Sequence, residues 1–286
     1  ALVAPKGWSV EVAGADRTAI LHADAPRHAG LTVFPVEADA KEAFRVDAIS
    51  YPHIGTTIWR EPARLRVLSL DLALPTQRRI GYVGGGADNV GLWLRRMGFD
   101  TVELMEADLA GDLGSFDSIV IGVVAFGARP ALAGQAAALH RYVDAGGNLG
   151  TLYHRPDQWD AVKTPPHRLR IGSPSLRWRV TDPAAPVSVI AHNHPLLNRP
   201  NRIGADDWDG WNKERGLYFA ADWDPAYQPL LAMSDAGEAP LNGAIVTAEI
   251  GKGRHSHVAL VLHHQMERLT PGAFRLLANL LDGRIA

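Results

Sequence analysis

The sequence predicts an α/β protein in two parts: a small β-sandwich over residues 1–76 and an open, mostly parallel sheet with helices on both faces over residues 77–286. Three observations carry this prediction. Apolar and polar residues alternate with period two before residue 76, as in half-buried strands. After Ile80, strand-like and helix-like segments alternate, which is typical of a parallel sheet covered by helices. Between them, an apolar strand over residues 80–83 runs into three glycines, Gly84, Gly85 and Gly86, and then into a helix.

Composition indicates an ordinary globular chain and excludes several classes of function. The 286 residues are 47% hydrophobic, enough to supply the cores of one or two domains. The 29 basic and 31 acidic side chains nearly cancel, and they form no basic run, so we expect no nucleic-acid partner. The absence of cysteine excludes disulfides, thiolate metal sites and a cysteine nucleophile. No apolar run is long enough for a membrane span.

In the first part, strands are expected at residues 8–12, 18–22, 31–36, 44–50 and 65–72. Thr32, Phe34 and Val36 alternate with other residues, as one half-buried face requires. Several short strands separated by turn residues favour a small sandwich. Its last strand ends near Pro75, which begins the expected linker to the second part.

In the second part, the first strand is followed by a helix at residues 89–97, with Asp88 as its N-cap and Gly98 just beyond its end. Strands follow at 101–104 and 118–124, a helix at 132–145 and a strand at 148–153. Residues 156–242 break this rhythm and are too long for one loop, so we expect an insertion folded onto the sheet. Strands at 244–250 and 257–262 and a closing helix from Thr270 and Pro271 complete the chain.

The glycines at the end of the first strand admit two interpretations. Bare amides at the start of a helix attract anions, so Gly85 and Gly86 are candidate ligand-binding residues. A dinucleotide fingerprint would need a glycine where Asn89 stands, and the chain has no phosphate-binding P-loop motif either. A simple strand-to-helix turn is therefore favoured over nucleotide binding.

The turn after the strand at 148–153 is a position where α/β enzymes carry a nucleophile on a sharp elbow. Tyr153 and His154 occupy it, with neither serine nor cysteine, and His264 would be the natural general base if a nucleophile existed. His154, His264 and Glu214 are the candidate catalytic residues, and none of them is assigned a definite role.

Paired histidines could contribute to a zinc site, but their spacing does not fix a third ligand. They are His192 with His194, His255 with His257, and His263 with His264. Solvated or locally hydrogen-bonded histidines are the favoured interpretation, and we expect no metal and no other cofactor.

The segment from Asp206 to Phe219 is rich in aromatic residues and carboxylates. It could line a sugar cleft, with Trp211 stacking and Asp206, Asp209 and Arg215 binding hydroxyls. The favoured alternative is that its tryptophans anchor the insertion to the sheet, with Glu214 and Arg215 pinning it through ion pairs, because large aromatic side chains dominate core burial.

Several segments, in their order, resemble the C-terminal region of large secreted LmbE-like (PIG-L-type) sugar N-deacetylases. The similarity runs from about residue 50 to the end of the chain. It rests on residues 51–54, 80–83, 116–122, 142–147, 194–201, 210–219 and 272–281. In that family a zinc-dependent deacetylase domain with a His-Pro-Asp-Asp motif precedes this region, and the present chain lacks that motif.

The resemblance implies a flavodoxin-like sheet of the class I glutamine-amidotransferase type, similar also to the ThuA-like trehalose-utilisation group. In true amidotransferases a cysteine occupies the elbow, where this chain has Tyr153 or His154. His263 or His264 falls near the expected histidine, but Gln265 follows instead of a Pro-Glu pair. Where the deacetylase family reads Arg-Ala-Tyr-Asn-x-Arg, only Arg129 is kept. These departures argue against glutaminase chemistry.

We therefore expect a non-catalytic accessory or carbohydrate-binding region of an N-acetylglucosaminyl deacetylase, in a secreted or periplasmic location. Its partners would be a carbohydrate or other small molecule and an N-terminal deacetylase domain. The expected ligand-binding residues are Gly85, Gly86, Arg129, Tyr153, Asp206, Asp209, Trp211 and Arg215. The alternative is a stand-alone ThuA-like enzyme, a hydrolase or isomerase acting on a sugar.

Overall fold

The structure is a computed structural model of the chain, and it describes residues 1–13, 18–23, 30–76 and 78–283. The chain divides into two compact units, Ala1–Asp71 and Leu72–Ala286. Each unit is described separately below.

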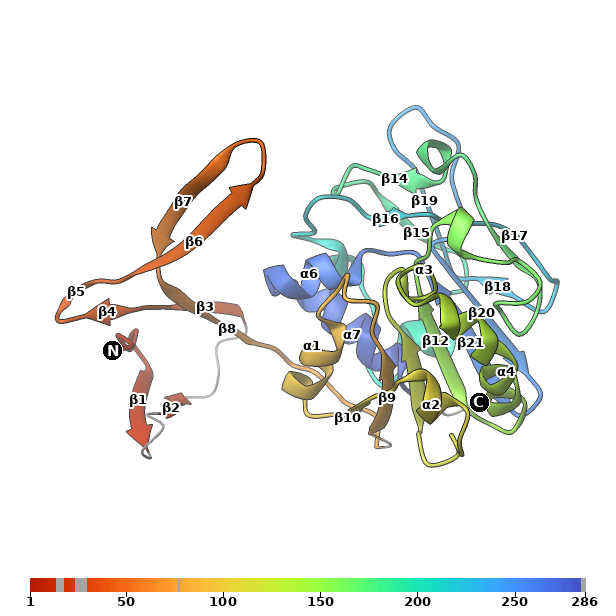
Figure 1. Cartoon of the computed structure of the whole chain (residues 1–286), viewed down its shortest axis with the longest axis horizontal. Helices are drawn as coiled ribbons and strands as arrows, with labels where there is room; N and C mark the ends of the chain where they lie inside the picture. The colour runs from red at the N-terminus through yellow and green to blue at the C-terminus, as the bar shows by residue number, and fades with distance from the viewer. Residues whose placement is uncertain (14–17, 24–29, 77, 284–286) are drawn as a thin grey trace. The chain divides into compact units, whose positions relative to one another are not determined.

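The strands of the first unit pair only in twos. The antiparallel pairs are β1 (Trp8–Ala13) with β2 (Thr18–Ala23), β3 (Gly30–Pro35) with β8 (Arg64–Ser69), β4 (Glu37–Ala38) with β5 (Lys41–Glu42), and β6 (Phe44–Tyr51) with β7 (Gly55–Pro62). Figure 1 shows β6 and β7 as a long two-stranded ribbon.

The predicted β-sandwich is therefore wrong for the described residues. A sandwich buries the inner faces of two sheets against each other, whereas Phe34 is the only fully buried apolar side chain that the structure describes in this unit. The predicted alternation in β3 is confirmed, since Phe34 is buried while Leu31 and Val33 are exposed. Period-two alternation identifies a strand with one apolar face, but it does not show whether a second sheet covers that face.

The second unit is built on a seven-stranded mixed sheet in the order β10-β9-β11-β12-β21-β20-β18. The strands are β9 (Arg79–Val83), β10 (Asp100–Glu103), β11 (Ser118–Ile121), β12 (Asn148–Leu152), β18 (Gln228–Pro229), β20 (Ile245–Ile250) and β21 (Gly253–Val258). The five strands from β10 to β21 are parallel to their neighbours, and β20 and β18 complete the sheet in antiparallel fashion.

Helices pack on both faces of this sheet. Helix α4 (Ala136–Asp144) packs against Leu149 and the other core residues of one face. On the other face, Leu280 of α7 (Pro271–Leu280) lies against the bare backbone of Gly150, where a Cβ atom would meet the leucine at 3.3 Å. Figure 1 shows the sheet with α4 on one side and α1 (Val90–Met97), α6 (Leu262–Arg268) and α7 on the other.

The elements between these are short. Helices α2 (Glu106–Leu109) and α3 (Ala125–Ala128) follow β10 and β11. The insertion contains helix α5 (Pro195–Asn198) and three two-stranded pairs: β13 (Leu169–Ile171) with β17 (Ala220–Trp223), β14 (Arg179–Val180) with β16 (Gly216–Leu217), and β15 (Val187–Val189) with β19 (Leu231–Met233). Only β18 of this segment joins the large sheet.

The last predicted strand, residues 257–262, is displaced along the chain. The observed β21 ends at Val258, and α6 begins at Leu262. His264 consequently lies inside a helix and not just past a strand. A short, continuous apolar run has no period that separates a strand from a buried helix start.

Candidate functional site

The carboxyl ends of the parallel strands form the edge at which the sequence places the site. After β9, a Cβ atom on Gly85 would meet the Cα atom of Ala125 at 2.8 Å, so the bare backbone is what allows this turn to pack on α3. Gly86 adopts a positive φ of 77° and is exposed. Of the two predicted ligand glycines, Gly85 serves packing and Gly86 faces solvent.

Asp88, predicted only as a helix cap, is a centre of hydrogen bonding at this edge. Its Oδ1 atom accepts hydrogen bonds from the Tyr82 hydroxyl and, at 2.8 Å, from the Val90 N–H group. Its Oδ2 atom accepts the Val123 N–H group at 2.7 Å. The carboxylate thus joins the turn after β9 to the turn after β11.

His154, the second elbow residue, is fully buried and bonded to the backbone through both ring nitrogens. Its Nε2 atom accepts the Phe126 N–H group at 3.2 Å, which leaves the proton on Nδ1 to be donated to the Leu152 carbonyl oxygen at 2.8 Å. Burial lowers the pKa of His154 to about 4. A neutral imidazole with both nitrogens engaged joins the elbow to α3, and it is not free to act as a general base.

Tyr153, the first elbow residue, lies at the centre of a group that we call the Tyr153 cluster, made of Tyr153, Tyr218, His263 and Glu214. The Tyr153 ring centroid lies 5.6 Å from that of Tyr218 and 5.6 Å from that of His263. Burial first, and then the charge of Glu214, raises the pKa of Tyr153. The structure thus packs Tyr218 and His263 on the predicted Tyr153, and the predicted Glu214 lies near enough for its charge to act on the Tyr153 hydroxyl.

The four residues lie far apart in the sequence, which explains the omission. The sequence offers His263 only as a partner of His264 or as the histidine that the resemblance implies, and Tyr218 only as part of an aromatic segment. One signal in the sequence could have identified part of the cluster. An aromatic residue, Tyr153, stands at the elbow, and a histidine pair, His263 and His264, follows the last strand of the sheet.

His264 lies next to this cluster and is only half-buried. Its ring centroid is 4.0 Å from that of His263, and the Nζ atom of Lys213 lies 3.3 Å from its Nδ1 atom. Burial and the Lys213 charge lower the pKa of His264. The contacts of His154 are with Phe126 and Trp159 instead, so the two predicted catalytic histidines belong to different surroundings.

Arg129 uses its guanidinium group within its own chain. Nε and Nη2 form a two-pronged ion pair with Glu106, at 3.0 and 2.8 Å. Nη1 donates to the carbonyl oxygens of Gly84 and Leu104. These bonds fasten α2 to the ends of β9 and β10 and favour a structural role over the predicted binding of a ligand.

The segment from Asp206 to Arg215 anchors the insertion. Trp208 and Trp211 are buried with ring centroids 5.5 Å apart, which favours a structural role for them over the stacking of a ligand on Trp211. Arg215 is buried too, but it donates to the carbonyl oxygens of Ala185 and Trp208 and forms no ion pair with the described residues, contrary to the prediction. The remaining predicted residues of the segment, Asp206 and Asp209, are exposed.

The histidines of β21 are buried and hydrogen-bonded, so of the two expected alternatives, solvated or hydrogen-bonded side chains, the second holds for them. His255 Nε2 and His257 Nδ1 lie 3.1 and 3.0 Å from the Thr151 hydroxyl, and the Tyr227 hydroxyl lies 2.6 Å from His255 Nδ1. Burial lowers the pKa of His255 to about 3. In the described part of the chain, no three histidine or carboxylate side chains are grouped so as to hold a metal ion.

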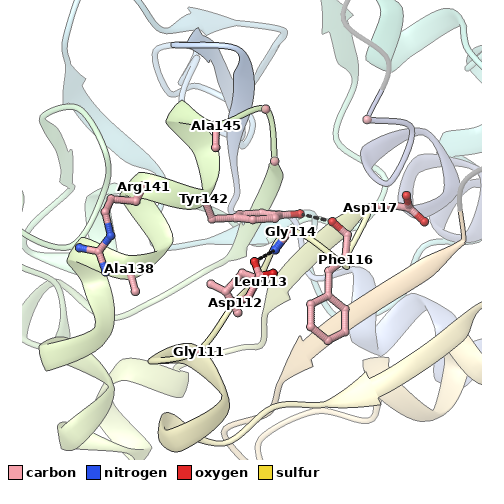
Figure 2. A pocket seen from close by; sticks show the side chains of 13 residues that line it. Gly111, Asp112, Leu113, Gly114, Phe116, Asp117, Ala138, Arg141, Tyr142 and Ala145 are labelled. Atoms are coloured by element: carbon pink, nitrogen blue, oxygen red, sulfur yellow. Dashed lines mark hydrogen bonds between the residues drawn. The ribbon is translucent and has the colours of Figure 1, made fainter.

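A concave region lies at the opposite edge of the sheet, before β11 and β12. It has a volume of about 450 Å³. Figure 2 shows Tyr142 pointing across it to donate a hydrogen bond to the Phe116 carbonyl oxygen at 3.1 Å. Its lining is Gly111, Asp112, Leu113, Gly114, Phe116, Asp117, Ala138, Arg141, Tyr142, Ala145, Gly146, Gly147 and Gly283. No sequence motif had indicated this hollow.

No protein-family model and no curated protein matches the chain. Among solved structures, a cytoplasmic protein of Salmonella typhimurium is 13% identical, with a TM-score of 0.47, over 84% of this chain and 94% of that one. A second, from Salmonella typhimurium LT2, is 12% identical, with a TM-score of 0.46, over 84% and 95%. A GMP synthase-like protein of Thermoplasma acidophilum is 11% identical, with a TM-score of 0.44, over 72% and 92%.

The comparisons bear on the predicted location of the protein. Both Salmonella proteins are described as cytoplasmic, which contradicts the predicted secreted or periplasmic location, and that prediction is withdrawn without another in its place. It had come from the resemblance to secreted deacetylases and from no residue of the chain itself. Separately, no helix among the described residues has both the length and the apolar character needed to cross a bilayer.

Proposed function

We propose that the chain is a non-catalytic accessory region of a PIG-L-type, LmbE-like N-acetylglucosaminyl deacetylase, and that it binds a carbohydrate or other small molecule at the carboxyl edge of its sheet. The deacetylase assignment rests on the segments that resemble that family. The assignment of the site rests on the edge where open α/β sheets bind their ligands.

The topology supports an amidotransferase-like, flavodoxin-like sheet as part of this proposal. Numbered in chain order among the five parallel strands, β9 to β21 lie in the order 2-1-3-4-5. This is the order of flavodoxin-like doubly wound folds, whose ligands bind beside the first and third strands. The turns of Gly85 and Val123 occupy that position here.

The observation that carries the non-catalytic assignment is the bonding of the elbow. Acyl-transfer chemistry at this position needs a hydroxyl or thiol nucleophile and a base within hydrogen-bond reach of it. Tyr153 is kept in its neutral form by burial, which raises its pKa. His154 donates and accepts backbone hydrogen bonds through both nitrogens. Neither residue is arranged to start such a reaction.

The test combines turnover and binding on the same purified chain. We expect no ammonia from glutamine and no acetate from N-acetylglucosamine above the rate of a buffer blank, and saturable binding of a saccharide in a calorimetric titration. Turnover that is lost in Glu214→Gln and kept in Glu238→Gln, an exposed carboxylate in the insertion, would overturn the proposal.

The parentage of the chain has its own test. Intact mass measurement and N-terminal sequencing of the native product should find a longer polypeptide, with a zinc domain carrying a His-Pro-Asp-Asp motif upstream of Ala1. A native product that begins at Ala1 after removal of a signal peptide contradicts the deacetylase connection.

One observation favours the alternative, a stand-alone ThuA-like hydrolase or isomerase acting on a sugar. Burial raises the pKa of Glu214, and a carboxyl group adjusted in this way is suited to general acid-base work. For this enzyme we expect turnover of a saccharide that falls at least about a hundredfold in Glu214→Gln, the lower end of what a general acid or base contributes.

A further inference from the structure

The Tyr153 cluster contains polar groups that the rest of the described chain leaves without partners. The His263 side chain is almost fully buried, with 4% of the residue exposed, and its Nδ1 atom has no hydrogen-bond partner among the described residues. No hydrogen bond or ion pair joins the Glu214 carboxylate, or the hydroxyls of Tyr153 and Tyr218, to another group in the described residues. Glu214 and Tyr218 are partly exposed, so water can serve their polar atoms. The Nδ1 atom of His263 is buried, and a buried polar atom without a partner calls for an occupant or a role.

The backbone at the same place is held in a sparsely populated conformation. Tyr218 adopts a φ of 58° and Lys213 a φ of 67°. For residues other than glycine, this left-handed conformation is uncommon and costs about 1–3 kcal/mol at a site. At the end of this segment, the Tyr218 ring packs on that of Tyr153 at the elbow.

The charges around the cluster select the type of ligand. Lys213 and Arg179 lie near enough to Glu214 to oppose the rise in its pKa, so positive and negative charge are both present. The two tyrosines provide neutral donors, and burial holds His263 neutral with a pKa of about 3. These neutral donors and this neutral acceptor match hydroxyl groups, which both donate and accept hydrogen bonds.

We propose, building on the function proposed above, that the Tyr153 cluster binds a neutral polyhydroxylated ligand, with Glu214 and His263 accepting from its hydroxyls and Tyr153 and Tyr218 donating to them. The ligand therefore binds between the elbow and the Lys213–Tyr218 segment of the insertion, and not on Trp211 and Arg215. Tyr218 and His263 become ligand-binding residues that the sequence did not identify.

The experiment uses three ligands with the same ring and different charges: glucose, glucuronate and glucosamine, with cellobiose as a larger neutral probe. Binding to the full chain is followed by protein-observed NMR titration. The test variants are Tyr218→Phe and Glu214→Gln, and their controls are Tyr51→Phe and Glu238→Gln, two exposed residues outside the cluster. Thermal unfolding confirms that each variant is folded.

We expect glucose or cellobiose to bind and the two charged sugars to bind at least about tenfold more weakly. Each test variant should weaken binding about tenfold, the effect of losing one well-formed hydrogen bond, while the controls match the parent chain. Saccharide binding that is unaffected in folded test variants overturns this inference and leaves the proposed function standing. Preferential binding of glucuronate or glucosamine overturns the neutral class. A complete absence of saccharide binding overturns both.

Discussion

At the residue scale, the polar side chains near the carboxyl edge differ in whether their hydrogen bonds are used within the protein. Arg129, Arg215 and His154 each direct two or more ring or guanidinium nitrogens to carbonyl oxygens, carboxylates or N–H groups of the chain. Glu214 and Tyr218 make no such side-chain bonds within the described residues. A side chain of a suitable type can bind a ligand only when its hydrogen-bond donors and acceptors are not already used within the protein.

His154→Ala should destabilise the second unit by about 3 kcal/mol. The substitution leaves the Phe126 N–H group and the Leu152 carbonyl unpaired in the interior and creates a cavity beside Trp159. Urea unfolding measures this change. His192→Ala, at an exposed position, is the control and should change the free energy of unfolding by less than about 0.5 kcal/mol. A His154 variant as stable as this control would refute the structural role of the imidazole.

At the scale of elements, the turn between β11 and α3 stores strain next to the elbow. Val124 has a φ of 49°, a conformation that is a genuine outlier for a β-branched residue. Its N–H group donates to the Tyr153 carbonyl oxygen, and its own carbonyl accepts the N–H groups of Gly127 and Ala128. These bonds hold the turn in place and connect the third and fourth parallel strands at the site.

Val124→Gly should therefore stabilise the chain, by about 0.5–1 kcal/mol, because glycine adopts this conformation without strain and the valine side chain is only partly buried. Val123→Gly, one residue earlier and almost fully buried, should destabilise by about 2–3 kcal/mol. Thermal unfolding of the two variants distinguishes them. Equal losses would show that the Val124 backbone is unstrained.

At the scale of the whole molecule, four buried neutral histidines make stability sensitive to mild acid. Burial lowers the pKa of His154 to about 4 and those of His255 and His263 to about 3, and it places that of His257 well below its usual value. Below about pH 6.5 the unfolded chain takes up protons at these positions while the native chain does not. Stability should thus fall as the pH decreases from about 6.5 towards 4.

The loss should approach about 1.4 kcal/mol per pH unit for each histidine once the unfolded state is protonated and the native state is not. Urea midpoints at pH 7.5, 6.0 and 5.0 test this prediction. This range lies above the usual pKa values of the carboxylates, and the carboxylates with lowered pKa values, such as Asp222 and Asp235, titrate further below it. A midpoint that is constant or rises over this interval contradicts the assignment of neutral buried histidines.

The two units also differ in what holds them together. The unit from Leu72 onward surrounds its sheet with apolar side chains on both faces. Pattern and capping predict the strands of the large sheet other than β18, and helices α1, α4 and α7, but not the short elements of the insertion or the other helices. In the first unit the sequence predicts five of the strands and misses β4, β5 and β7, and it does not predict how the strands assemble. Apolar residues such as Ile58 and Trp59 of β7 are 63% and 58% exposed, and no local pattern reveals whether a strand face is covered.

The sequence by itself determined the start of the α/β sheet, the glycine turn between its first strand and first helix, and the absence of a cysteine or serine at the elbow, because each depends on neighbouring residues or on residue type alone. Only the tertiary structure decided which side chains meet. It bonded His154 to the backbone and Arg129 to Glu106 and to backbone carbonyls, and it packed Tyr218 and His263 on Tyr153. Burial and hydrogen bonding depend on residues distant in the chain, and they determine which polar groups remain free for a ligand.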